Sequence, residues 1–413
     1  MRTPPSVYDD RQWPYVLTFL PHDLEDSARQ SHALVRCRNV PDAVALIRMA
    51  LAYAVSDLSL KDIAAWASSL KVAEITGPGL FYRLREAEGW LERVLAQTLQ
   101  SEVRKGPSGL QLRIVDATVI VGPGATGTEW RAHVRINPAT GGFQSVELTD
   151  HLGGEGYALH PIVAGEVVLG DRAYATARGI YAVSEVKAQV VARLNPHTLR
   201  ICGLNRKRIF ILKEERKVPK TGAIEFNVIV PIPPAKRSKT HKSWSLSKAV
   251  AWVPARIVAA RTRQRKVIWI LTTVPREQVT PLRIMELYRL RWQIELLFKR
   301  LKSLLHLDTL PSRQGPTARS WILARLLAAA LAQKLVQPSG PFSPWGYELR
   351  EERLPHSSWS RFRMTLWAIR GAILGAGPWL VVRSEKGMQR LQNSPRRRKP
   401  ATISQWVYRV SLF

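Results

Sequence analysis

The stretch LRIVDATVIV, residues 112–121, predicts a β-strand, because β-branched residues dominate it and Gly122, Pro123 and Gly124 stop it. The sequence downstream continues in this manner. Further strands are expected at TEWRAHVRI (128–136), GFQSVEL (142–148), EVVLG (166–170) and AQVVARL (188–194), with helices at 157–163 and 173–186. This alternation predicts a mixed α/β sheet at the centre of the chain.

Two aspartates occupy unusual positions in these strands. Asp116 lies inside an otherwise apolar strand, where a charge is costly unless something compensates it. Asp171 directly follows EVVLG, at the strand end where an α/β sheet presents ligand-binding groups. One strand aspartate is usually a hydrogen-bonded structural residue, but a pair with a third acid is typical of a metal site.

The third acid lies in LYRLRWQIELLFKRLKSLL, residues 287–305, part of one long helix expected from 280 to about 305. Five polar side chains fall within an arc of roughly 80° on this helix, next to an apolar stripe that would dock on the sheet. The polar face comprises Tyr288, Arg291, Glu295, Lys299 and Lys302; the stripe comprises Leu287, Leu290, Ile294, Phe298 and Leu301. A solvated face with ordinary ion pairs is the alternative, and the two strand aspartates favour the metal site. Mg²⁺ takes oxygen ligands of this kind.

The chain is strongly basic, with 62 Lys and Arg against 32 Asp and Glu and a net charge of +30. Such a surface attracts a polyanion. Basic residues recur through several globular segments, which favours nucleic acid over a membrane surface. Residues 196–266 alone hold 18 Lys or Arg and three acids. The hairpin patterns RIFILKEERKV and IEFNVIVPI predict a folded basic β insertion there, rather than a solvated linker, with PAKRSKTHKS as a loop. VIWILTT (267–273) predicts the next strand.

The N-terminal part has a helical pattern after an irregular stretch over residues 1–40. Within 41–100, Ser59 is a good N-cap for the helix LKDIAAWASSLKV. A turn over residues 76–79 precedes a second helix, from about residue 80, that carries Tyr82, Arg83 and Arg85. Helix, turn and basic helix are the order of a helix-turn-helix, although any helical hairpin has a similar pattern.

Cysteine content and hydropathy exclude several classes. Cys37 and Cys202 are the only cysteines, too few for a disulfide framework or a zinc site, and they fit a reducing cytoplasm. The apolar stretch 321–336 contains Arg325 and Lys334 and is shorter than a membrane span, so a buried helix is expected over 318–336. Residues 364–374 also have a helical pattern, and the basic tail SPRRRKP is expected to be disordered.

These residues resemble the bacterial DDE transposases of the insertion-sequence-4 family. Tyr288, Arg291, Glu295 and Lys302 match the Tyr-x2-Arg-x3-Glu-x6-Lys signature of one group in that family. IVDAT around Asp116 is similar to its first aspartate motif, and GDRAY, which contains Asp171, is similar to its second. The resemblance covers about residues 40–340.

The resemblance implies a ribonuclease H-like core, a two-metal site of Asp116, Asp171 and Glu295, and Mg²⁺ as cofactor, with Mn²⁺ as a substitute. It implies cleavage at transposon ends, in some members through a hairpin, and joining of 3′-hydroxyls to target DNA. Tyr288 and Arg291 would contact phosphates near a flipped base, and Lys299 and Lys302 phosphates at the cleavage site. A Trp would stack on that base: Trp269 is the candidate, unless the alignment places Ile268 there, with Trp244 and Trp252 as fallbacks.

The implied organisation has five parts. They are a helical DNA-binding domain (1–105), the core in two pieces (106–195 and 267–340), the basic insertion (196–266), and a C-terminal region with a dimer contact (341–413). The expected partners are inverted-repeat and target double-stranded DNA and a second copy of the chain, in the bacterial cytoplasm at the nucleoid, with no membrane.

Two other functions stay open on the sequence. A non-catalytic DNA-binding regulator would share the charge and the helical hairpin, but would not explain three acids on this frame. A ribonuclease H-like nuclease or junction resolvase would share the metal chemistry, but would lack the basic insertion and the Tyr/Arg/Lys face. A defective transposase copy is a further alternative, although no signature residue is missing.

Overall fold

The computed structural model describes residues 12–99, 110–125, 127–138, 141–234, 244–262, 264–308, 310–311, 315–336 and 358–375. At its centre is a ten-stranded mixed sheet with the order β3-β2-β1-β4-β5-β10-β9-β8-β6-β7. The strands are β1 (Gln111–Ile120), β2 (Trp130–Asn137), β3 (Gly142–Asp150), β4 (Glu166–Gly170), β5 (Gln189–Arg193), β6 (Ile201–Cys202), β7 (Arg208–Ile209), β8 (Ala223–Ile232), β9 (Ala251–Arg261) and β10 (Val267–Thr272).

The register of this sheet brings the two predicted strand aspartates together. β1 runs parallel to β4, and β4 runs parallel to β5, while the other pairs are antiparallel. Ile114 on β1 pairs with Leu169 on β4. Asp116 and Asp171 each lie two residues beyond this pair, so they stand at the same level of two adjacent strands.

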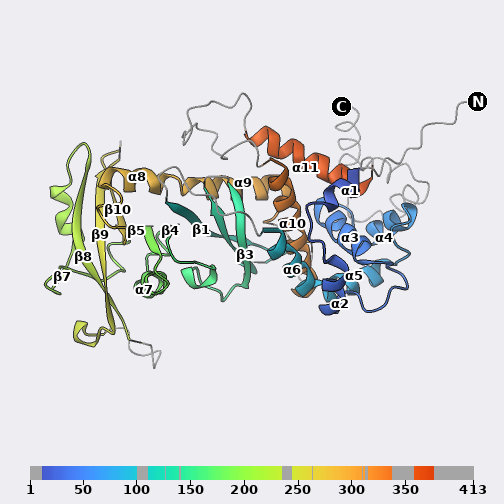
Figure 1. Cartoon of the computed structure of the whole chain (residues 1–413), viewed down its shortest axis with the longest axis horizontal. Helices are drawn as coiled ribbons and strands as arrows, with labels where there is room; N and C mark the ends of the chain where they lie inside the picture. The colour runs from blue at the N-terminus through green and yellow to red at the C-terminus, as the bar shows by residue number, and fades with distance from the viewer. Residues whose placement is uncertain are drawn as a thin grey trace, which may run out of the picture.

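Helices cover both faces of the sheet (Figure 1). α8 (Pro281–Arg289) and α9 (Trp292–Leu305) pack on one face, and α7 (Ala177–Glu185) packs on the other. α10 (Gly315–Val336) stands between the sheet and the N-terminal helices, and α11 (Ser358–Leu374) packs against it. The expected helix over 318–336 is thus confirmed, and most of its residues from 318 to 333 are buried. Among the described residues, no helix has both the length and the apolar character that a membrane crossing requires.

The N-terminal part is helical from its first described residues. Its helices are α1 (Gln12–Leu17), α2 (Leu24–Gln30), α3 (Ala43–Val55), α4 (Leu60–Ser69), α5 (Gly77–Glu86) and α6 (Glu88–Leu99). α1 and α2 correct the expectation that residues 1–40 are irregular; these two helices are too short to give a readable period. Ser59 caps α4 as expected, in a capping box with Asp62. α5 begins at Gly77, earlier than expected, because Thr76 caps it and a proline is tolerated in a first helical turn.

The expected long helix over 280–305 is two helices. The backbone N–H groups of Leu290 and Arg291 bond to the carbonyl groups of Leu287 and Tyr288, three residues earlier. The same three-residue spacing continues at Gln293, so this turn is tighter than an α-helix. The tight turn separates α8 from α9 and places Arg291 at the junction.

The basic insertion extends the core sheet. β9 pairs with β8 over residues 251–260 and with β10 over residues 256–261, so IEFNVIVPI and VIWILTT form strands as expected. RIFILKEERKV is not a hairpin: Arg208–Ile209 is a two-residue strand, and Ile211–Lys217 is a 3₁₀ helix. The expected helices at 157–163 and 173–186 are also shorter, namely a 3₁₀ turn at Tyr157–Leu159 and α7. Most of PAKRSKTHKS and all of SPRRRKP lie outside the described residues.

Candidate active site

Asp116 lies on β1, and its carboxyl group contacts Arg291 at the junction of α8 and α9. Its Oδ1 accepts a hydrogen bond from the backbone N–H of Ala117 at 2.9 Å, and its Oδ2 accepts one from Arg291 at 3.3 Å. Burial raises the pKa of Asp116 to about 7; the charges of Asp171 and Glu155 add to this rise, and the Ala117 N–H and Arg291 oppose it. A carboxylate in this position is well suited to a cation.

Asp171 begins the loop that follows β4. Its Oδ1 accepts a hydrogen bond from the N–H of Ala173 at 2.7 Å, which fixes the carboxyl group at the strand end. The residue before it must be small. A Cβ on Gly170 would lie 2.7 Å from both the Tyr157 hydroxyl and the Tyr174 Cβ. Gly170 therefore lets two buried tyrosines pack directly behind the aspartate.

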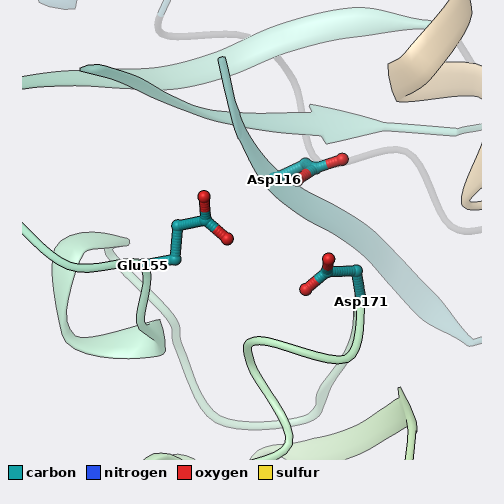
Figure 2. Close-up of side chains that lie close together, drawn as sticks. All are labelled: Asp116, Glu155 and Asp171. Atoms are coloured by element: carbon teal, nitrogen blue, oxygen red, sulfur yellow. The ribbon is translucent and has the colours of Figure 1, made fainter. Parts of the chain in front are cut away.

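The structure adds a third acid that the sequence did not single out. Asp116, Glu155 and Asp171 each offer a carboxylate oxygen, and these oxygens all lie within 4.8 Å of one another. Figure 2 shows Glu155 reaching the site from the loop after β3, and Asp171 approaching from the loop after β4. Burial raises the pKa of Glu155, and the Asp171 charge adds to the rise while Arg131 opposes it.

Glu155 had one signal in the sequence. It lies in LGGEGY, where glycines at 153, 154 and 156 surround a single acid. Such a loop has no hydrophobic period, so it gives no indication of the direction in which the acid points. The sequence pattern predicts β3, the strand before this loop, but it does not predict that the loop returns towards β1.

Arg291 connects Glu295 to this site. Its guanidinium group bonds to Asp116 and also to Oε1 of Glu295, one turn along α9. The Glu295 side chain is 42% exposed. The structure thus brings Asp116 and Asp171 together as expected, while Glu295 is linked to Asp116 through Arg291. The centre of the Tyr288 ring lies 5.8 Å from the guanidinium carbon of Arg291. Burial raises the pKa of the Tyr288 hydroxyl.

The remaining residues of the expected helix face divide by exposure. Lys299 is exposed and Lys302 is half-buried. The apolar stripe from Leu287 to Leu301 is buried as expected: its members are Leu287, Leu290, Ile294, Phe298 and Leu301. Both lysines lie on α9, C-terminal to Glu295.

The candidate stacking tryptophans differ in burial. Trp269 is only 5% exposed and packs with Phe226 inside the sheet, which favours the alternative that it is a core aromatic. Trp244 and Trp252 are half-exposed, and each packs against an arginine, Arg200 and Arg206 respectively.

α5 presents the predicted DNA-binding residues unequally. Tyr82 is 53% exposed, and the guanidinium carbon of Arg85 lies 4.9 Å from its ring centre. Arg83 instead donates a hydrogen bond to the carbonyl of Arg36 and pairs with Glu86. Tyr82 and Arg85 are therefore the accessible members of this set.

Comparisons with known proteins agree with this geometry. The family model described as a transposase DDE domain matches residues 107–331, more than half of the chain and all three clustered acids. The chain belongs to the DDE transposase family. InsL, named as the transposase of insertion sequence element IS186A in Escherichia coli strain K12, is 33% identical over 82% of this chain and 97% of its own length. The Escherichia coli transposase of insertion sequence element IS421 has the same identity and coverage.

A solved structure was also compared. The cryo-EM structure of the piggyBac transposase synaptic complex with hairpin DNA superposes with a TM-score of 0.46 and 9% identity, over 95% of this chain and 86% of that chain.

As a DDE transposase, the chain is an enzyme that cleaves and transfers DNA. A DDE domain implies a divalent metal, and the residues present fit one. Three carboxylate oxygens converge, and burial with repulsion from neighbouring acids makes the charged forms of Asp116 and Glu155 costly without a cation. Oxygen-only ligands of this kind suit a hard cation such as Mg²⁺.

Proposed function

We propose that this transposase cleaves DNA at the terminal inverted repeats of an insertion sequence and joins the 3′-hydroxyls to target DNA. The placement of Asp116 and Asp171 at one level of β1 and β4, with Arg291 connecting Asp116 to Glu295, is the observation that carries the proposal. Asp116, Asp171 and Glu295 would hold Mg²⁺, for which Mn²⁺ would substitute. When bound, the metal lowers the pKa of the attacking oxygen and stabilises the leaving one.

Arg291 has a distinct part in this proposal. It is a cation between two acids, and a DNA phosphate would compete with those acids for its guanidinium group. Its transfer to phosphate would leave both carboxylates open to a cation. Tyr288 would hold Arg291 during this exchange, and Lys299 and Lys302 would contact the phosphates farther along α9.

The other parts would bind the DNA on either side of this site. Tyr82 and Arg85 on α5 would contact the inverted repeat, and the arginine-backed Trp244 and Trp252 are better placed than the buried Trp269 to stack on a flipped base. Two copies would act together, because two transposon ends must be held at once. Size measurement with and without end DNA would test this dimer.

The deciding experiment measures Mg²⁺-dependent strand cleavage and end-DNA binding in the same samples. Asp116→Ala, Asp171→Ala and Glu295→Ala should each lose cleavage at least a hundredfold and keep DNA binding within about threefold. Glu286→Ala, an exposed acid on α8 that pairs with Arg283, is the matched control and should cleave normally. Full cleavage by any of the three variants would remove that residue from the site.

Arg291→Ala extends the same assay. It should weaken cleavage more than it weakens binding to non-specific DNA, because its partners are the site acids. An equal loss of both would make it a general phosphate contact.

A further inference from the structure

Glu155 lies where a metal ligand would lie, although the sequence signature places the third acid on α9. Its carboxylate shares the 4.8 Å cluster with Asp116 and Asp171. Figure 2 shows the Glu155 carboxyl group directed at the space between the strand and the Asp171 loop. Glu295, by contrast, is bound by Arg291.

The ion pair with Arg131 accounts for Glu155 only in part. Its nearest cation is Arg131, whose Nε lies 3.9 Å from Oε1, beyond hydrogen-bonding distance. Arg131 instead directs a hydrogen bond at the carbonyl of Gly153. The charge of Glu155 is therefore only partly balanced by protein groups, and it faces two further acids.

A second observation at the same place points to a missing ligand. Tyr157, two residues after Glu155, is 2% exposed, and its hydroxyl has no hydrogen-bond partner among the described residues. This hydroxyl lies against Gly170, directly before Asp171. Buried hydroxyl groups almost always have a partner, so this hydroxyl is available to a ligand bound beside Asp171.

We propose that Glu155 is a metal ligand, which binds a divalent cation together with Asp116 and Asp171 before DNA is engaged. The inference rests on the proposed function, which takes Asp116 and Asp171 as metal ligands. It adds Glu155 as the third ligand. Glu295 then contributes only after Arg291 is drawn to phosphate. The enzyme without DNA thus has one three-carboxylate cation site that does not need α9.

Mn²⁺ binding to the full chain without DNA, measured by electron paramagnetic resonance, tests this order. Glu155→Gln should weaken Mn²⁺ binding at least tenfold, and Glu155→Asp, which keeps the carboxylate, should recover part of the loss. Glu295→Gln should change it less than twofold. Glu277→Gln, an exposed acid beyond β10, is the control for loss of one charge. Thermal unfolding of each variant confirms that it is folded.

Several outcomes would overturn the inference. They are Mn²⁺ binding by Glu155→Gln equal to that of Glu277→Gln, no Mn²⁺ binding by the unaltered protein without DNA, or lower thermal stability of Glu155→Gln with unchanged Mn²⁺ binding. The last result would make Glu155 a structural partner of Arg131.

The same assay separates this inference from the proposed function. If Asp116→Ala and Glu295→Ala lose cleavage while Glu155→Gln binds Mn²⁺ normally, the proposed function stands and Glu155 is not a ligand. If Asp116→Ala and Asp171→Ala cleave DNA and bind Mn²⁺ as the unaltered protein does, both fail.

Discussion

His133 and His160 form a buried pair next to β1, where His133 on β2 pairs with Ala117. Their ring centres are 6.4 Å apart, His133 bonds to the Thr149 hydroxyl, and the Nδ1 atoms of both rings have no hydrogen-bond partner among the described residues. Burial lowers the pKa of His133 to about 4, with Arg131 adding to the effect. Burial also lowers the pKa of His160 to about 3, with His133 and Arg135 adding to it. Both rings are therefore neutral in the folded protein at pH 7.

This pair predicts a loss of stability in acid. The unfolded chain binds the protons near pH 6.5 and the folded protein only near pH 4 or below, so stability is complete above pH 6.5 and falls as the pH drops towards 4. Each histidine should lower the free energy of unfolding by about 2 kcal/mol between pH 7 and pH 5. Urea unfolding at the two pH values measures this difference. His160→Gln should reduce it, whereas exposed His197→Gln should leave it unchanged; an unchanged difference in His160→Gln would contradict the assignment.

At the residue scale, the sequence predicts two of the three clustered acids. Asp116 and Asp171 are predictable because a charge in an apolar strand, or at its end, is unusual and both strands have clear patterns. Glu155 is not, because its position depends on how an irregular glycine loop folds back on β1. The contact between Glu295 and Arg291 could not be predicted either, because it depends on side-chain geometry rather than on the spacing of the two residues.

Three strands, β1, β2 and β4, are held together by a buried group of three charged side chains. Glu166 at the start of β4 forms an ion pair with Arg113 on β1, with 2.9 Å between the charged atoms, and accepts a hydrogen bond from Arg135 on β2. All three side chains are at most 7% exposed. The triad ties the three strands five residues before Asp171. Removing one partner of a buried ion pair leaves a charge without compensation.

Glu166→Gln should therefore lower the free energy of unfolding by about 3–5 kcal/mol. Glu214→Gln, which breaks the more exposed pair with Lys217, should lower it by less than about 1 kcal/mol. Urea unfolding at pH 7 compares the two. Similar values for both variants would show that the triad adds nothing beyond a surface pair.

α5 gives the second element-scale prediction. Arg85 is exposed beside Tyr82, whereas Arg83 is tied to the Arg36 carbonyl. If α5 contacts DNA, Arg85→Ala should weaken end-DNA binding and reduce the slope of log affinity against log salt by about 1, the value for one phosphate contact. The exposed Lys187, on the loop after α7, supplies the control Lys187→Ala. An unchanged slope in Arg85→Ala would place α5 away from the DNA.

The elements themselves were more predictable than their ends. Strands β1, β4 and β10 and helices α4 and α10 follow their hydrophobic patterns closely. The break between α8 and α9 was not predictable, because the apolar stripe continues through it without interruption. The break consists of backbone hydrogen bonds between residues three apart, and these bonds require no particular residue types.

At the scale of the whole molecule, the N-terminal helices and strands β1 to β4 share one core. The largest hydrophobic cluster runs from Trp13 through β1 and α10 to Leu374. Arg48 and Trp66 donate hydrogen bonds to the carbonyls of Ile373 and Leu374, which fixes α11 on α3 and α4. The sequence pattern suggested separate domains instead. Contacts between residues hundreds of positions apart, such as these, leave no periodic signal in the sequence.

A second cluster lies on the insertion side, between β8–β10 and α7, and includes Val230 and Trp269. The two clusters predict two units of local stability in one continuous sheet. Leu327 on α10 is fully buried in the first cluster, so Leu327→Ala should cost about 2–5 kcal/mol and affect α3 and β1 together.

Hydrogen exchange by mass spectrometry distinguishes these units. In Leu327→Ala, peptides covering residues 43–55 and 111–120 should lose protection by the same factor, because they share the cluster that α10 fills. In Val230→Ala, the loss should be greatest over residues 223–232 and smaller over 43–55. If Leu327→Ala loosened residues 43–55 alone, the N-terminal helices would be a separate folding unit, and α10 could not hold a DNA-binding part rigidly against the catalytic sheet.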